Sequence, residues 1–123
     1  MYTIRKMFSF SASHILTELE PGHQCMRMHG HNYVITVELK SYDLNDASFV
    51  LDYGKLKPVK DFIEGTLEHR HLNDIVPGQP SAENIAKWLF YKFKPQFPLL
   101  NAIEVKETDK TSARWEEDKG LLI

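Results

Sequence analysis

The sequence has little that would cross-link the chain or hold it in a membrane. Its single cysteine, Cys25, excludes a disulfide within the chain, and no apolar run is long enough to cross a bilayer. Because 15 basic and 17 acidic residues leave a net charge of −2, no basic field favours nucleic acid or an anionic membrane as a partner. The N-terminal segment alternates too regularly for a signal peptide. These absences predict a cytoplasmic protein.

The chain also lacks internal repeats, low-complexity tracts and linkers rich in proline or glycine. Its length fits one domain with one core, so residues 1–123 are predicted to form a single domain. Apolar residues at 42% and charged residues at 26% are the usual balance of a globular protein.

Alternating side chains predict two long strands in the first third of the chain. Residues 3–14 and 31–41 place apolar side chains at every second position, which is the period of a strand with one buried face. Residues 15–28 contain a Pro-Gly pair and alternate poorly, so they predict a loop. Residues 49–51 predict a further short strand.

Two helices and two more strands follow, at residues 54–68 and 81–94 and at residues 101–108 and 111–116. Asp52 and Ser81 are suited to cap the helices, and each helix has an apolar stripe at helical spacing. The elements predict an α+β fold, an antiparallel four-stranded sheet with two helices packed on one face. Its open strand edges predict edge-to-edge assembly of several chains.

Four ionisable side chains extend the apolar rows of the predicted strands. His14 continues the buried face of the first strand, His29 and His31 continue that of the second, and Glu107 continues that of the third. A buried polar group without a partner costs roughly 1–3 kcal/mol. These four side chains therefore need partners near the strand ends.

A divalent cation would satisfy the three histidines together. Zinc binds neutral imidazole nitrogens in tetrahedral geometry, and three protein ligands leave a fourth position for water or substrate. A His-x-His pair on one strand is usually incidental, and the third histidine on a second strand is what favours a metal site. His69 and His71 offer a competing pair, in a segment too irregular to assure a shared face.

Two further groups have both a chemical and a structural interpretation. Cys25 is either a small buried side chain or, with Arg27 and a metal nearby, a thiolate that acts as base or nucleophile. Glu68 and His69 form either a carboxylate–imidazole pair or a solvated helix end, and the residues alone favour the solvated end.

Five short motifs occur in order along the chain: FSASH at 10–14, CMRMHGH at 25–31, HRHLND at 69–74, PSAEN at 80–84 and VKET at 105–108. This set, spread over nearly the whole chain, resembles the 6-pyruvoyltetrahydropterin synthase family. The resemblance implies a tunnel fold, in which subunits join edge to edge into trimers. In that family two trimers stack with active sites at subunit interfaces, so the resemblance implies a homo-hexamer. The family's zinc ligands match His14, His29 and His31.

The resemblance also implies the other site residues. The family's catalytic cysteine matches Cys25, and its acid–base histidine matches His69. The glutamate that anchors the pterin ring matches Glu107, where a carboxylate can accept paired hydrogen bonds from the ring. The carboxylate partner of the acid–base histidine is usually aspartate in the family, and this chain has Glu68 there.

The three residues between Cys25 and His29 are similar to the spacing in bacterial 6-carboxytetrahydropterin synthases of the queuosine pathway. Pyruvoyl-forming members usually have a longer gap. A variant that forms a hydroxymethyl pterin has a glutamate in this loop, and none lies between Cys25 and His29. The resemblance therefore implies zinc-dependent conversion of 7,8-dihydroneopterin triphosphate into 6-carboxy-5,6,7,8-tetrahydropterin, with release of acetaldehyde and triphosphate.

Three alternatives stay open at this point. One is a pyruvoyl-forming synthase, which eliminates triphosphate without cleaving a carbon–carbon bond. Another is a non-catalytic tunnel-fold protein that binds a pterin or purine, with a structural metal. The last is a metal-binding protein that uses His69 and His71. Three basic residues are either contacts for the triphosphate or solvated surface charges, namely Arg27, Lys110 and Arg114.

Overall fold

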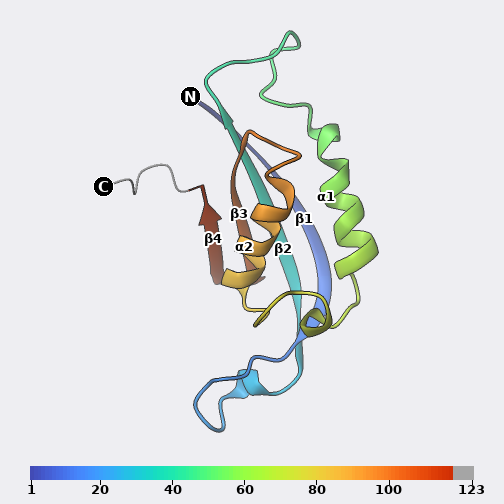
Figure 1. Cartoon of the computed structure of the whole chain (residues 1–123), viewed down its shortest axis with the longest axis vertical. Coiled ribbons are helices and arrows are strands. Elements are labelled where there is room, and N and C mark those ends of the chain that lie inside the picture. The colour runs from blue at the N-terminus through green and yellow to red at the C-terminus, as the bar shows by residue number, and fades with distance from the viewer. Residues whose placement is uncertain (118–123) are drawn as a thin grey trace, which may run out of the picture.

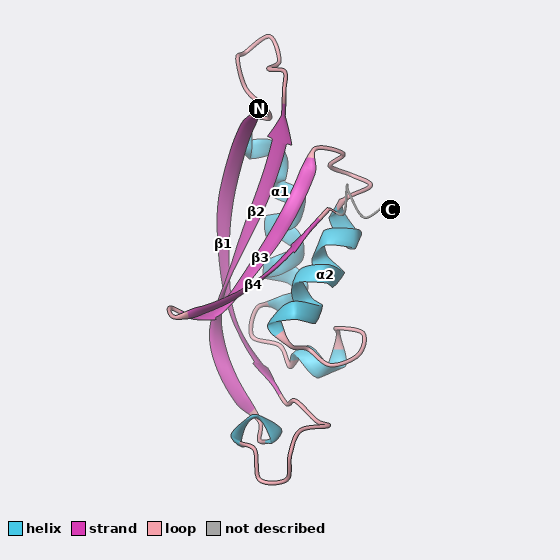
Figure 2. Cartoon of the chain, turned by 90° about the vertical axis from the view of Figure 1, so that its left-hand side faces the viewer, coloured by secondary structure: helices cyan, strands magenta, loops and turns pink. Residues whose placement is uncertain are grey.

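The computed structural model describes residues 1–117. These residues form one antiparallel sheet of four strands in the order β1-β2-β3-β4 (Figure 1). The strands are β1 Tyr2–His14, β2 His29–Ser41, β3 Leu100–Thr108 and β4 Thr111–Glu116. Helices α1 and α2 both lie on one face of the sheet (Figure 2), which confirms the predicted α+β architecture. Within residues 1–117, no helix is long and apolar enough to span a membrane.

The long hairpin of β1 and β2 determines where the predicted ligands lie. Its register pairs His14, the last residue of β1, with His29, the first residue of β2. Residues 15–28 connect the two strands as the predicted loop, with a 3₁₀ turn η1 over Gln24–Met26. This loop projects from one end of the molecule (Figure 1). The ligand positions are therefore at the base of the loop.

The helix predicted over residues 54–68 is a succession of three helix types. They are the 3₁₀ helix η2 Tyr53–Leu56, the α-helix α1 Lys57–Phe62 and the π-helix η3 Ile63–Leu67. Asp52 caps the start, because its side chain accepts a hydrogen bond from the Gly54 N–H at 2.9 Å. At the end, the Glu68 N–H donates to the Ile63 carbonyl, five residues back. The chain then turns toward β1, where the His69 N–H donates to the Ser11 carbonyl at 2.7 Å.

Helix α2 Ala82–Phe93 packs on β3 and β4. Ser81 caps it as predicted, since its hydroxyl accepts a hydrogen bond from the Asn84 N–H at 3.2 Å. Its apolar stripe is buried against the sheet and comprises Ile85, Ala86, Leu89, Phe90 and Phe93. A short 3₁₀ helix, η4 Leu72–Asp74, lies between α1 and α2 in the chain.

The strand predicted at residues 49–51 is wrong, because this segment belongs to a loop. The Asn45 side-chain oxygen accepts hydrogen bonds from the N–H groups of Ala47 and Phe49, each at 3.0 Å. The Asn45 N–H in turn donates to the Phe49 carbonyl at 2.8 Å. These local bonds satisfy backbone groups that would otherwise pair with a strand.

A buried carboxylate links all four strands. Glu38 on β2 is 1% exposed and accepts hydrogen bonds from Arg5 on β1, Asn101 on β3 and Arg114 on β4. Burial raises its pKa, but the bonds from Arg114, Asn101 and Arg5 outweigh burial and hold the pKa at about 2. Arg114 is therefore already engaged by Glu38.

Candidate metal centre

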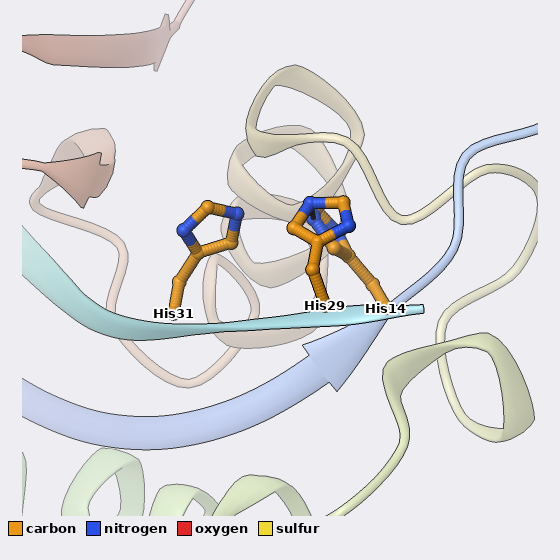
Figure 3. Close-up of side chains that lie close together, drawn as sticks. All are labelled: His14, His29 and His31. Atoms are coloured by element: carbon orange, nitrogen blue, oxygen red, sulfur yellow. Dashed lines mark hydrogen bonds between the residues drawn. The ribbon is translucent and has the colours of Figure 1, made fainter. Parts of the chain in front are cut away.

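Three imidazole rings come together where β1 ends and β2 begins. The register puts His14 opposite His29, and His31 lies two residues further along the same face of β2. Figure 3 shows the three rings projecting to the same side of the two strands. One ligand nitrogen from each ring lies within 4.8 Å of the others. The structure thus brings together the side chains that strand parity predicts to share a face.

Hydrogen bonds assign the proton in two of these rings. His14 Nδ1 lies 2.8 Å from the Pro80 carbonyl oxygen, and His29 Nδ1 lies 2.7 Å from the Arg27 carbonyl oxygen. Because a carbonyl oxygen only accepts, each Nδ1 donates and each Nε2 presents a lone pair. The two Nε2 atoms are 2.8 Å apart, so they need a shared proton or a cation that both can bind. Nδ1–H bonds to carbonyls are typical of histidines that bind metals.

The third ring, His31, differs from the other two. Among residues 1–117, His31 Nε2 is a buried polar atom without a hydrogen-bond partner. It lies 3.5 Å from Oε2 of Glu107, which reaches the cluster from the end of β3. An unpaired buried nitrogen costs free energy, and a bound cation would remove that cost. The donor set therefore fits zinc.

The electrostatics of the cluster favour neutral imidazole at its centre. Burial is the main effect on His14, and it lowers the pKa of this ring. The bond to the Pro80 carbonyl and the charge of Glu107 raise that pKa, while the neighbouring histidines lower it. Neutral histidine is the form that binds a metal ion.

Two groups that contact His14 were not predicted from the sequence. The carbonyl of Pro80 is one, and the hydroxyl of Tyr33, 3.2 Å from His14 Nδ1, is the other. Burial raises the pKa of Tyr33 above its ordinary value, and the charge of Glu107 adds to this effect. The phenol therefore keeps its proton. The sequence does contain one indication of Tyr33. This tyrosine lies two residues after His31 on the same buried face of β2, so its hydroxyl is placed near the predicted ligands.

A cavity of about 600 Å³ opens beside Glu107 at the β4 edge of the sheet. The loop after β1, the start of α2 and strand β4 contribute to its wall, through residues that include Leu16, Leu19, Ser81, Ala82, Thr111 and Arg114. Its lining is more apolar than polar. A small ligand with a flat apolar body and polar edges suits such a site.

Cys25 lies in η1, partly buried and outside the group of ligand atoms. Its carbonyl accepts a hydrogen bond from the Leu16 N–H at 2.9 Å, and its N–H donates to His23 Nδ1 at 3.0 Å. These bonds hold the loop in place at Cys25, three residues before Met28, which directly precedes β2. The position is consistent with a cysteine that does not bind the metal, and its catalytic role stays a prediction.

The Glu68 carboxylate and the His69 ring lie close enough to form the carboxylate–imidazole pair, and His69 is largely solvated, as the other interpretation expects. Glu68 Oε1 lies 3.0 Å from His69 Nε2 and accepts a bond from the Ser11 N–H at 3.3 Å. His69 has a left-handed backbone with φ of 58°, and its side chain is 81% exposed. The pair lies beside the edge strand β1, whose outer backbone groups at Ser11 and Ser13 already bond to the 69–71 segment, whereas the cavity beside Glu107 opens at the β4 edge.

Within the described part of the chain, the competing histidine pair has no third ligand grouped with it. His71 Nδ1 lies 2.9 Å from the Ser13 hydroxyl, and its backbone bridges Ser13 on the edge of β1. The only group of three or more ligand side chains found within residues 1–117 is the one formed by His14, His29 and His31. The structure therefore favours the strand-end cluster over His69 and His71.

Comparison with known proteins identifies the family. The model of the family described as 6-pyruvoyl tetrahydropterin synthase matches residues 3–118. The chain belongs to this family. A solved structure of the Caenorhabditis elegans 6-pyruvoyl tetrahydropterin synthase has 27% sequence identity and a TM-score of 0.82, over 95% of this chain and 96% of that chain. This match confirms the tunnel fold.

Relatives in the 6-pyruvoyl tetrahydropterin synthase family differ in their reactions. The 6-carboxy-5,6,7,8-tetrahydropterin synthase of Bacillus subtilis is 29% identical over 98% of this chain and 89% of its own length. The dihydroneopterin monophosphate aldolase of Pyrococcus furiosus is 32% identical over 73% of this chain and 73% of its own length. The chain is therefore an enzyme of a pterin-processing family, whose particular reaction depends on the site.

Proposed function

We propose that the chain is a zinc-dependent lyase that converts 7,8-dihydroneopterin triphosphate into 6-carboxy-5,6,7,8-tetrahydropterin. Acetaldehyde and triphosphate are the other products, and the reaction is a step towards queuosine. The observation that carries the metal part is the cluster of three imidazoles with two Nε2 lone pairs 2.8 Å apart. The three-residue gap between Cys25 and His29 and the Bacillus subtilis relative support the carboxy product.

In this proposal the histidine cluster binds the side chain of the substrate, and the cavity binds its pterin ring. A zinc ion held by His14, His29 and His31 would supply a Lewis acid that lowers the pKa of the two side-chain hydroxyls of the pterin. Glu107 lies between this cluster and the cavity. Its carboxylate accepts hydrogen bonds from the ring N–H and amino groups, which orients the pterin with its side chain toward the histidines.

Proton transfer falls to Cys25 and to the Glu68–His69 pair. Cys25 as thiolate removes a proton from the substrate side chain. His69, oriented by Glu68 through the 3.0 Å contact, moves protons at the other steps. Since this pair lies on the β1 edge and the cavity on the β4 edge, a neighbouring chain joined edge to edge supplies it. The proposed assembly is a homo-hexamer made of two such trimers.

A product assay tests this function. The purified protein is loaded with zinc and incubated with 7,8-dihydroneopterin triphosphate, and the pterin, triphosphate and acetaldehyde are measured. We expect acetaldehyde and 6-carboxytetrahydropterin in equal amounts. Triphosphate without acetaldehyde would instead identify a pyruvoyl-forming synthase. In a parallel incubation with dihydroneopterin monophosphate, turnover of this substrate and not of the triphosphate would identify an aldolase. Binding without turnover of either would identify a non-catalytic pterin-binding protein.

The variant Cys25→Ala is the control for the roles within the site. We expect it to lose turnover while it keeps about one zinc per chain, because the sulfur is not among the ligands. Loss of zinc from this variant would show that Cys25 binds the metal and that the assigned roles are wrong. The variant His29→Ala should bind zinc far more weakly but still measurably, whereas an unchanged affinity in this variant would favour His69 and His71.

A further inference from the structure

Tyr33 is fully buried, yet it places a hydroxyl beside a predicted metal ligand. Its exposed fraction is 0%, and its ring stacks on Phe10 with the centroids 4.9 Å apart and the planes 11° from parallel. It meets His14 and His31 edge-on, with centroids 6.0 and 5.5 Å away. These contacts from three sides hold the phenol in one orientation.

The hydroxyl of Tyr33 has a single hydrogen-bond partner within residues 1–117, and that partner is His14 Nδ1 at 3.2 Å. Nδ1 already donates to the Pro80 carbonyl at 2.8 Å, so it carries the hydrogen. The phenol oxygen is then the second acceptor of a three-centre hydrogen bond from the same N–H group. The two acceptors come from different parts of the fold. Tyr33 is on β2, and Pro80 is in the loop before α2.

We propose that Tyr33 is a positioning residue of the metal centre. Its hydroxyl and the Pro80 carbonyl together hold the His14 ring in the tautomer and rotation that present Nε2 to the ion. One acceptor alone would leave the ring free to swing about its Cβ–Cγ bond, and two acceptors on separate elements restrict that motion. The inference rests on the proposed zinc site of His14, His29 and His31.

The chemistry of burial supports a role for the hydroxyl. Phenylalanine would fill the same space and make the same stack on Phe10. A buried hydroxyl costs free energy unless it makes a good hydrogen bond, and the bond to His14 is long at 3.2 Å. Packing of the core therefore gives no reason for a tyrosine at this position, whereas control of a metal ligand does.

The variant Tyr33→Phe tests this, because it removes the hydroxyl and keeps the ring. Zinc affinity is measured by competition with a chromophoric chelator, and the visible spectrum of the cobalt-substituted protein reports the coordination geometry. We expect affinity to fall by about tenfold, as is typical for a lost outer partner of a metal ligand, with a shifted cobalt spectrum. The variant Tyr91→Phe, at a tyrosine on α2 that is 56% exposed, should change neither.

A double-mutant cycle shows whether Tyr33 acts through His14. We expect Tyr33→Phe to weaken zinc binding in the His29→Ala background by a similar factor, and to have no further effect in the His14→Ala background. A loss that persists without His14 would overturn the inference, as would unchanged affinity and spectrum in Tyr33→Phe. If the unmodified protein binds no zinc, the proposed function fails first, and that result is distinct from a zinc-binding protein indifferent to Tyr33→Phe.

Discussion

Glu107 lies where the cavity meets the imidazole cluster, 3.5 Å from His31 Nε2. Replacing it by alanine should remove one or two charge-assisted hydrogen bonds to the pterin ring, and weaken binding by roughly 2–5 kcal/mol. Binding is measured by fluorescence titration with 6-carboxypterin. The variant Glu107→Gln keeps one acceptor oxygen, so its affinity for the pterin should lie between those of the unmodified protein and Glu107→Ala. An unchanged affinity in Glu107→Ala would remove this residue from the pterin site.

At the scale of residues, parity along a strand predicted more of the site than any other signal. It placed His14, His29, His31 and Glu107 on one face, and the structure brings all four together. It could not reveal the Pro80 carbonyl, because that contact joins residues 66 positions apart through the docking of the α2 loop on β1. Backbone groups carry no sequence signal of their own, so contacts of this kind need the tertiary structure.

The β1–β2 hairpin tolerates little extra volume between its two predicted ligands on β2. A Cβ added at Gly30 would lie 3.3 Å from the Ala12 carbonyl oxygen, whereas one added at Gly65 in η3 would have nothing within 4 Å. Gly30→Ala should push β1 and β2 apart locally and weaken zinc binding severalfold.

The matched change at Gly65 should have the opposite effect on stability. Gly65→Ala should stabilise the fold by about 0.5–1 kcal/mol, since alanine loses less backbone entropy in a helix, and should leave zinc binding unchanged. Urea unfolding and chelator competition measure the two quantities. Equal zinc affinity in both variants would show that the spacing of the hairpin does not control the metal centre.

The helices show where a periodic pattern loses resolution. The residues predict one helix over 54–68, and the structure has three helix types over the same stretch. Apolar spacing over one turn does not separate a 3.6-residue repeat from a tighter or wider turn. The difference matters, because the π turn of η3 brings Glu68 and His69 against β1, where the Ser11 N–H donates to Glu68 and the Glu68 carboxylate lies 3.0 Å from His69 Nε2. The short strand expected at 49–51 fails for a related reason, since the Asn45 side chain competes for its backbone groups.

The whole sheet depends on the charge of Glu38, which links β1 to β4. Its pKa in the fold is about 2, against 4.5 for the ordinary side chain. A lowered carboxylate pKa contributes stability that is complete above about pH 4.5 and is lost as the pH falls toward 2, by roughly 3 kcal/mol in total. Urea unfolding at pH 7 and pH 3 measures the larger part of this difference, because pH 3 is still above the pKa in the fold.

A substitution isolates that contribution from other acidic groups. Glu38→Gln should lower stability at pH 7 and flatten its dependence on pH, because the glutamine cannot gain a proton. Glu64→Gln, at an exposed helix position, should keep the full dependence. If both variants respond to acid alike, the network around Glu38 does not control the acid sensitivity of the fold.

Two inactive variants distinguish a site shared between chains from a site within one chain. In the proposed assembly, Cys25 and Glu107 of one chain work with His69 of the next. Cys25→Ala and His69→Ala should each be inactive alone. Co-assembled in equal amounts, they should regain about a quarter of the normal activity. With random assembly, about a quarter of the subunit interfaces combine an intact Cys25 on one chain with an intact His69 on the next. A mixture that stays inactive would place the whole reaction within a single chain.

If the Glu68–His69 pair, which lies on the flank of the sheet opposite the cavity, serves the neighbouring chain as proposed, each chain depends on its neighbour for proton transfer. Each interface between neighbouring chains would then form one complete active site. A closed ring has as many interfaces as chains, whereas an open row of chains has one fewer. Dilution would then switch the enzyme off without unfolding it, and the rate per chain would fall as rings come apart.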